Sequence, residues 1–407
     1  MSERVPALPD HIHLSAEFRL LAAVSWVAAP ELLTFQADRI ISICTKYHID
    51  WQEFTVLVER HRVPVLAYIA LQKHVAGCVP VEILSQLKEL STRSRMQALR
   101  HAAELVRVLK VFSAHGIEVI PLKGLLLSQQ LYSDPCIRHS KDLDLMVRPE
   151  HVDLAGRLLK EHGYTNIFPG FELGERHKRY LSTAIHHFEY LHHETGLCVE
   201  LHWRSFLWTP AQTEKMWLHS RREAWMGAQV NSLDSILQFL YLCDHGAGHK
   251  WFRLKWLSDI AMMVTQRGTV ESAELVRAAG ELDLTKTLVQ TCLLVQWLYN
   301  INLSEPFATL IDEEKDAHVL AETALKELFF SEEKILSSGK RFESLRRVWY
   351  IMRLKPEMPR SIIMKSILIS PVDLKMLPLP PRLFFLYIPL RPFLWFWRHY
   401  LVKSGKP

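Results

Sequence analysis

The sequence lacks both the cysteine patterns and the apolar runs that define several protein classes. Its 407 residues contain six scattered cysteines without a C-x-x-C pair or a short regular spacing, so neither a thiolate zinc site nor a disulfide framework is predicted. No uninterrupted apolar run reaches the roughly 18 to 20 residues that a transmembrane helix needs. We therefore expect a cytoplasmic protein without a transmembrane segment.

The sequence also lacks a strong excess of charge of one sign. Its formal net charge is +5, from 49 basic and 44 acidic residues, which is too small for this length to indicate a nucleic-acid-binding surface. Apolar residues make up 49% and charged residues 23%, as in ordinary globular proteins. Internal repeats and low-complexity linkers are not found. The composition predicts a folded chain and leaves its class of partner open.

An apolar segment near the N-terminus, 20-LLAAVSWVAAP-30, is similar in composition to a signal peptide. Asp10 and Glu17 precede it, and helical patterning continues through residues 31–43, so we interpret it as a core helix.

The C-terminal segment 383-LFFLYIPLRPFLWFWRHYL-401 is the other strongly apolar stretch, and prolines and arginines interrupt it. We expect it to pack on the core. The alternative is an aromatic and basic anchor that makes peripheral contact with a membrane surface.

Hydrophobic periodicity divides the chain into four regions. Residues 1–114 are predicted to be an N-terminal helical region, residues 115–210 a small α/β core, residues 211–370 a C-terminal helical domain, and residues 371–407 a tail rich in proline and aromatic residues. The helices expected from this pattern span residues 51–61, 64–74, 81–116, 123–132, 149–164, 232–249 and 255–266. The expected strands span residues 117–122, 142–147, 186–193 and 197–203, the last two forming a hairpin through Glu194-Thr195-Gly196.

Three acidic residues lie in the predicted strands among apolar neighbours. Asp142 and Asp144 in 139-HSKDLDLMV-147 share one strand face because side chains alternate with period two, and Glu200 lies in 198-CVELHW-203. If these strands are adjacent, the carboxylates converge, and their repulsion requires a positive partner. Such oxygen ligands favour Mg²⁺ or Mn²⁺, as used in phosphoryl and nucleotidyl transfer.

The turn at Lys123-Gly124, between a predicted strand and a predicted helix, has the features of a phosphate-binding loop. Free backbone N–H groups at a helix start, next to a flexible glycine, favour an anion, and Lys123 adds a positive charge. A Lys-Gly pair in this position is weak support when taken alone.

Taken together, LKG, LYSDPCIRHSKDLDLMV and VELHW resemble the nucleotidyltransferases of the polymerase-beta-like superfamily, and in particular its bacterial branch of uncharacterised nucleotidyltransferases. The resemblance covers roughly residues 115–205 and extends more loosely to 242–260 and 371–392. It implies an α+β fold, with a small mixed-sheet core flanked by N- and C-terminal helical regions. It also implies that Asp142, Asp144 and Glu200 are the catalytic, metal-binding carboxylates and that Gly124 belongs to the nucleotide-phosphate loop.

The sequence departs from the superfamily pattern in three places. Leu125 follows Gly124 where a second Gly or a Ser is usual, so a hydroxyl contact to phosphate is missing. The segment from Gly124 to Asp142 is longer than usual, which suggests an extra loop in which Arg138 is a candidate phosphate or acceptor contact. Glu200 replaces the commoner Asp.

Histidines crowd the predicted hairpin, and with Glu189 and Glu200 they suggest a zinc site as an alternative: His186, His187, His192, His193 and His202. Strand alternation places His186 and His187 on opposite faces, which argues against convergence. We expect His202, two residues from Glu200 on the same face, to orient a ligand or contact a triphosphate. The basic cluster 176-RHKRY-180 is interpreted as surface, with acceptor contact as the alternative.

The leading hypothesis is a nucleotidyltransferase that uses Mg²⁺ or Mn²⁺ to move a nucleoside monophosphate from an NTP to an acceptor and releases pyrophosphate. Asp142, Asp144 and Glu200 would bind metal, and Lys123, Gly124, Arg138 and His202 would bind the nucleotide. The acceptor stays open among a small molecule, a sugar phosphate, a peptide, a protein and an RNA. The alternatives are a catalytically inactive nucleotide-binding or scaffolding protein of the same fold and a zinc hydrolase that uses the hairpin histidines.

Overall fold

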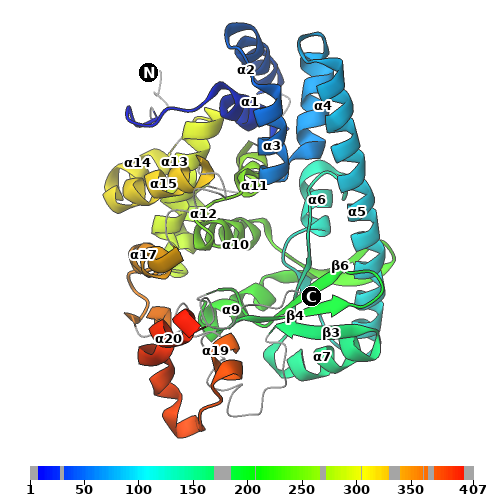
Figure 1. The fold of residues 1–407 in the computed structure, drawn as a ribbon, viewed down its shortest axis with the longest axis vertical. Coiled ribbons are helices and arrows are strands. Elements are labelled where there is room, and N and C mark those ends of the chain that lie inside the picture. Colours follow the sequence, from blue (N-terminus) through cyan, green and yellow to red (C-terminus); the bar gives the residue numbers. More distant parts are fainter. Residues whose placement is uncertain are drawn as a thin grey trace.

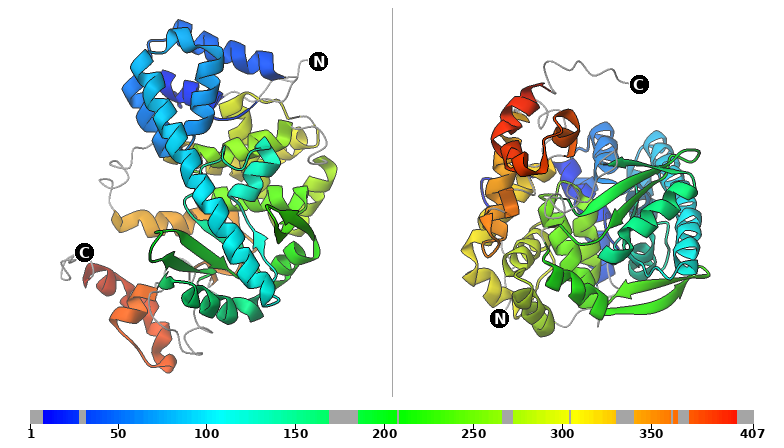
Figure 2. Two further views of the ribbon diagram at one scale, coloured as in Figure 1. Left: turned by 90° about the vertical axis from the view of Figure 1, so that its right-hand side faces the viewer. Right: turned by 90° about the horizontal axis from the view of Figure 1, so that it is seen from below.

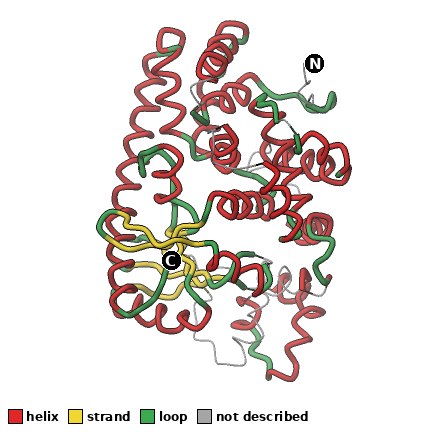
Figure 3. Tube along the Cα trace, turned by 180° about the vertical axis from the view of Figure 1, so that it is seen from behind, coloured by secondary structure: helices red, strands yellow, loops and turns green. Residues whose placement is uncertain are grey.

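The computed structural model has α+β architecture, with helices grouped around a five-stranded sheet and a two-stranded sheet (Figure 1). It describes residues 8–27, 32–168, 185–206, 208–265, 272–303, 305–329, 340–360, 362–364 and 371–397. The basic cluster at 176–180 lies outside these residues. Seen from behind, the strands gather in one part of the molecule while helices form most of the rest (Figure 3). The fold class expected from the sequence is confirmed.

In the described part of the N-terminal region, all regular secondary structure is helical. Its helices are α1 (Ala16–Val24), α2 (Leu33–Lys46), α3 (Trp51–His61), α4 (Pro64–His74), η2 (Ala76–Cys78) and α5 (Val81–Ala114). The predictions for 51–61 and 64–74 are confirmed at both ends, because Asp50 caps α3 and Pro64 occupies the first turn of α4. In the apolar segment that begins at Leu20, the residues from Leu20 to Trp26 are buried in the core, as predicted, and α1 ends at Val24. Residues 28–30 of that segment lie outside the described chain.

The sheet has five strands in the order β1-β2-β5-β4-β3. They are β1 (Ile120–Pro121), β2 (Leu143–Met146), β3 (Tyr164–Phe168), β4 (His187–His192) and β5 (Cys198–His202), accompanied by the helices α6 (Leu125–Tyr132), η3 (Pro149–His151) and α7 (Val152–Glu161). β2 pairs in parallel with β5, and the other three pairings are antiparallel. The sheet is therefore mixed, and the predicted hairpin between β4 and β5 is confirmed.

The two faces of this sheet differ in chemistry. Leu143, Leu145, Val199 and Leu201 lie in a core cluster with apolar residues of α5 and α7, which cover that face. The long α5 runs from the N-terminal helices down to the sheet (Figure 2). Since side chains alternate along a strand, the intervening residues of β2 and β5 face the opposite side. That opposite face carries the polar residues of the candidate site.

Two features of the fold differ from the sequence prediction. The helix expected over 149–164 ends at Glu161, and the chain enters β3 at Tyr164. Helical patterning was expected from residue 211 onward, but β6 (Ser220–Trp225) and β7 (Ala228–Leu233) form a hairpin there. Its turn, Met226-Gly227, has positive φ at both residues (46° and 76°), which joins strands tightly without the usual Asn-Gly signal.

The helices after the sheet form the second helical layer. They are α9 (Pro210–Leu218), α10 (Ser235–Gly248), α11 (Leu254–Thr265), α12 (Ser272–Glu281), α13 (Thr285–Tyr299), α14 (Phe307–Glu313), α15 (Lys315–Phe329) and α17 (Lys340–Leu354). One hydrophobic cluster contains residues from both helical regions, and Phe18 of α1 contacts Phe329 of α15 edge to face at 4.6 Å. α10 and α11 are the helices that border the polar face of the sheet.

The tail comprises α19 (Pro371–Met376), η4 (Pro381–Leu386) and α20 (Tyr387–Phe396). Leu374, Phe384 and Tyr387 form a small cluster with Ile185, just before β4. Part of the tail thus packs against the chain at the start of β4, in a cluster separate from the two main core clusters. Phe393 is 71% exposed, and residues 398–401 lie outside the described chain. Among the described residues, no helix is both long and apolar enough to span a membrane.

Candidate functional site

A row of carboxylates crosses the polar face of the sheet. Asp144 of β2 is the register partner of Glu200 of β5, and Glu200 is in turn the partner of Glu189 of β4. Asp142 precedes β2 by one residue and lines the same cavity as Glu200 and Glu189. Asp142, Asp144 and Glu200 were predicted from the sequence as the carboxylates of the site, and the structure adds Glu189 to the row.

Asp144 and Glu200 differ in pKa and therefore in ionisation. Asp144 is 2% exposed, and its Oδ1 lies 2.8 Å from Lys123 Nζ and 3.4 Å from His202 Nε2. Although burial opposes ionisation, the charge of Lys123 holds the pKa of Asp144 well below its usual value. Burial, together with the charge of Asp144, raises the pKa of Glu200 to about 9. One carboxylate is therefore ionised and its neighbour carries a proton at neutral pH.

The turn before α6 positions Lys123 against these carboxylates. The Leu122 N–H donates to the Asp144 carbonyl, and Gln238 of α10 donates to the Leu122 carbonyl. Gly124, at the start of α6, has φ +85° and ψ −127°, and a Cβ there would lie 3.2 Å from Ser140 Oγ. Only glycine adopts this conformation readily, so the turn depends on it. Burial opposes a charge on Lys123, but Asp144 outweighs it and raises the Lys123 pKa.

Arg138 lies apart from the cavity lining. Its guanidinium is 3% exposed and its Nε donates to both carboxylate oxygens of Asp259 in α11, at 3.0 and 2.8 Å. A direct contact of Arg138 with phosphate would require this ion pair to break. The other predicted site residues except Gly124 and the fully buried Asp144 line one cavity: Lys123, Asp142, Glu200 and His202.

The cavity has a volume of about 550 Å³. Its basic lining comes from several elements far apart in the sequence: Arg62, Lys123, Arg347 and Arg391. Lys255 also lines the cavity, but burial and the charge of Arg138 hold its pKa well below the usual value. A cavity with this much positive charge beside a row of carboxylates suits a phosphate ester that arrives with a divalent cation.

Opposite the sheet, helices α10 and α11 supply a wall of rings. The ring of His249 lies 4.8 Å from His245 and 5.3 Å from Trp256, centroid to centroid. Burial lowers the pKa of His249 to about 3, and burial with the charge of Lys123 lowers that of His245 well below its usual value. Both imidazoles are therefore neutral at physiological pH and present flat, polarisable surfaces to the cavity. His245 and His249 are four residues apart in the sequence, but the contact of both rings with Trp256 joins α10 to α11 and is visible only in the fold.

Two sets of side chains could hold a metal ion among the residues that the structure describes. Asp144, Glu200 and His202 offer ligand atoms within 4.8 Å of one another, and so do His186, His187 and His202. Neither Asp144 oxygen accepts a regular hydrogen bond there, although both are buried. Asp142 lies outside the first set of three and lines the cavity beside it. The donor chemistry of the carboxylate set fits a hard divalent cation.

Comparison with known proteins gives one family and no individual relative. Searches of the curated proteins and of the solved structures produced no match. The sequence model described as "Uncharacterised nucleotidyltransferase" matches residues 47–300, which is more than half of the chain and reaches from near the start of α3 to the end of α13. The match includes the sheet, the Lys123-Gly124 turn and the wall of rings, but not the tail. The chain therefore belongs to the uncharacterised nucleotidyltransferase family.

Proposed function

We propose that this protein transfers a nucleoside monophosphate from an NTP to an acceptor hydroxyl, with release of pyrophosphate, in a reaction that depends on a divalent metal ion. The observation that carries the proposal is the pairing of Asp144 with Glu200 across β2 and β5, beside Asp142 and under a cationic cavity wall. Family membership supports the transfer of nucleotidyl groups in general.

Asp142, Asp144 and Glu200 would hold Mg²⁺ or Mn²⁺. The buried Asp144 oxygens and the proton that Glu200 retains at neutral pH both indicate that this site has negative charge to neutralise. When bound, the ion offsets negative charge on the phosphates and makes the acceptor hydroxyl more acidic.

In the transfer step, the acceptor oxygen forms a bond to the α-phosphorus, and the bond from that phosphorus to the oxygen of the departing pyrophosphate breaks. With a cation bound beside Asp144, Glu200 would lose its own proton and would then accept the proton that the acceptor hydroxyl loses. The side chains around the cavity hold the two reactants in line, which is the main task of a protein in phosphoryl transfer.

Lys123, the backbone at Gly124 and His202 are the proposed phosphate contacts. Lys123 and His202 line the cavity, and Gly124 is the N-cap of α6, whose first backbone N–H groups have no carbonyl partner within the helix. Arg138, which the sequence suggested as a further contact, is better suited to a positioning role. Its pair with Asp259 fixes the segment before β2 against α11.

The proposal is tested by replacing both aspartates, Asp142→Ala with Asp144→Ala, and measuring Mg²⁺-dependent NTP binding by calorimetry. We expect binding to disappear because the phosphates lose their bridging cation. Asp153→Ala, at an exposed position of α7, is the matched control and should bind as the unaltered protein does. Binding by the double variant at unchanged affinity would refute the proposed site.

One observation favours a second candidate, a nucleotide-binding protein without transfer activity. Lys123 already neutralises Asp144 at 2.8 Å, so the site has a built-in cation. This candidate predicts NTP binding that does not depend on metal. Incubation with labelled NTP and cell extract separates the two candidates, because a covalently labelled product forms only if the protein catalyses transfer.

A further inference from the structure

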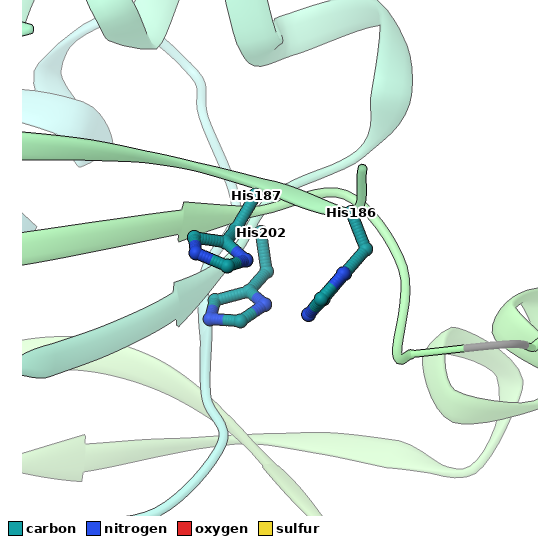
Figure 4. A group of neighbouring side chains, drawn as sticks. All are labelled: His186, His187 and His202. Carbon is teal, nitrogen blue, oxygen red and sulfur yellow. The ribbon is translucent and has the colours of Figure 1, made fainter. Parts of the chain in front are cut away.

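Three histidine rings meet at the end of the sheet where β4 begins and β5 ends (Figure 4). His187 and His202 are direct partners in the antiparallel register, and His186 precedes β4 by one residue. The ring centroids lie 4.6 Å apart for His186 and His187, 4.9 Å for His187 and His202, and 5.6 Å for His186 and His202. One ring nitrogen from each residue lies within 4.8 Å of those of the other two.

In two of these rings one nitrogen lies near a carboxylate and the other has no hydrogen-bond partner. His202 Nε2 lies 3.2 Å from Glu200 Oε2, and His187 Nε2 lies 3.5 Å from Glu189 Oε1. The Nδ1 atoms of His187 and His202 are buried and have no hydrogen-bond partner in the described structure. A buried polar atom without a partner is costly and uncommon, and a missing ion is one standard reason for it.

The same arrangement is the usual one around protein-bound zinc. A ligating imidazole binds metal through one nitrogen while its other nitrogen hydrogen-bonds to a carboxylate, which fixes the ring and raises its basicity. Here Glu189 and Glu200 occupy the carboxylate positions, and the Nδ1 atoms are the available ligand atoms. His202 itself is 5% exposed, so it is held in a built site rather than on a mobile surface.

This site shares His202 with the carboxylate set, but its other two donors are nitrogen rather than oxygen atoms. Nitrogen ligands favour zinc and neighbouring transition metals, whereas oxygen ligands favour magnesium. Three protein ligands leave one tetrahedral position open, as in catalytic rather than structural zinc sites. All three histidines line the cavity, so the open position would face any ligand bound there.

We propose that His186, His187 and His202 form a second metal site that binds one transition-metal ion, of the Zn²⁺ type, with its open position toward the cavity. The ligand class for this position is an anionic oxygen, such as a phosphate or carboxylate group of the acceptor. This proposal does not rest on nucleotidyl transfer.

The test uses the full chain, stripped of metal with a chelator and then dialysed against Zn²⁺ or Co²⁺. We expect about one equivalent of tightly bound zinc by elemental analysis, and the visible absorption of four-coordinate Co²⁺ in the cobalt form. The double variant His186→Ala with His187→Ala removes two ligands and leaves Asp144, Glu200 and His202 in place. It should lose at least about 100-fold in zinc affinity, since single supporting residues around zinc already contribute 10- to 100-fold.

His193→Ala is the matched control, because this exposed histidine of the same hairpin contacts Thr165 and lies outside the three-histidine set. It should retain zinc at the affinity of the unaltered protein. Circular dichroism of each variant separates metal loss from unfolding. The proposal is overturned if the unaltered protein retains no zinc, or if a folded His186→Ala, His187→Ala variant retains it undiminished. Failure of NTP binding would leave these outcomes unaffected, so the two proposals fail separately.

Discussion

Two buried ion pairs in this protein have the same length but differ in their access to the cavity. Lys123 Nζ lies 2.8 Å from Asp144, and Arg138 Nε lies 2.8 Å from Asp259. The side chains of the first pair are 13% and 0% exposed, and Lys123 lines the cavity. Those of the second pair are 2% and 1% exposed and do not line it. Both cations looked like phosphate ligands in the sequence, but only Lys123 has a side open to a ligand.

Asp259 and Asp144 also differ in the hydrogen bonds that their carboxylate oxygens accept. Both oxygens of Asp259 accept from the same Arg138 nitrogen, whereas neither Asp144 oxygen accepts a regular hydrogen bond within the described chain. Asp144 further shares its surroundings with Glu200, whose pKa is raised by burial and by the charge of Asp144. We infer that the Arg138–Asp259 pair stabilises the fold, whereas the carboxylates beside Lys123 are able to bind a further cation.

Breaking the Arg138–Asp259 pair should lower the free energy of unfolding more than any other change considered. Asp259→Ala leaves the Arg138 charge buried without its partner, and we expect the free energy of unfolding to fall by about 3–5 kcal/mol. Denaturant titration measures this change. The double variant Arg138→Met with Asp259→Leu removes both charges and should recover much of the loss. Equal stability of Asp259→Ala and the unaltered protein would contradict the assignment.

Breaking the Lys123–Asp144 pair should destabilise the protein less and weaken NTP binding more. Lys123→Met leaves Asp144 without its neutralising charge, at a cost of about 1–3 kcal/mol in the absence of metal. Added Mg²⁺ should restore part of this stability by supplying the missing charge, and NTP affinity should fall by about tenfold through loss of a charged phosphate contact. Thermal unfolding with and without Mg²⁺ and NTP titration measure both effects. The exposed Lys141→Met is the control; if it behaves like Lys123→Met, the charge effect is not specific to this pair.

The proton on Glu200 gives the open site a distinct pH dependence. Burial and the charge of Asp144 raise the pKa of Glu200 to about 9, against roughly 4.3 for an unfolded Glu. The folded protein therefore holds a proton that the unfolded chain releases between these values. Stability from this group is complete below the lower value and is lost as pH rises through the upper one.

Glu200→Gln does not titrate, so without metal its midpoint temperature relative to the unaltered protein should rise between pH 6 and pH 9. Melting curves in chelator at both pH values measure this difference. Parallel pH dependence of the two proteins would show that Glu200 does not carry the proton.

The smallest effect is expected at the tail side of the cavity. Arg391 lines the cavity, but its Nη1 lies 2.9 Å from the buried Asp373, so much of its charge is already neutralised. Arg391→Gln should weaken NTP binding only about two- to threefold. A loss as large as that of Lys123→Met would show that the tail takes part directly in phosphate binding.

The sequence predicted the carboxylates because their signal is local. A period-two pattern places Asp142 and Asp144 on one face, and the apolar neighbours of Glu200 indicate a buried strand. It could not predict that β2 and β5 pair in parallel, because that register brings together residues far apart in the chain. The partners of Lys123 and Arg138 are non-local for the same reason, so both cations looked alike.

Other departures arise where a local rule stops applying. Alternation placed His186 and His187 on opposite faces, but His186 lies just outside β4, where the strand period does not hold. The β6–β7 hairpin was missed because charged residues occupy its first strand (220-SRREAW-225) and its turn is Met-Gly. The helices α3 and α4 were predicted to the residue because capping and proline signals mark their starts.

The most direct test of the proposed function is an assay of nucleotidyl transfer. The unaltered protein and Asp144→Asn are incubated with Mg²⁺, cell extract and NTP labelled at the α-phosphate, and covalently bound label is counted. We expect a labelled product with the unaltered protein and a loss of at least about 10²- to 10³-fold with the folded variant, because the substitution removes transition-state charge stabilisation. Equal labelling by both proteins, or NTP that is bound by the unaltered protein and never transferred, would contradict it.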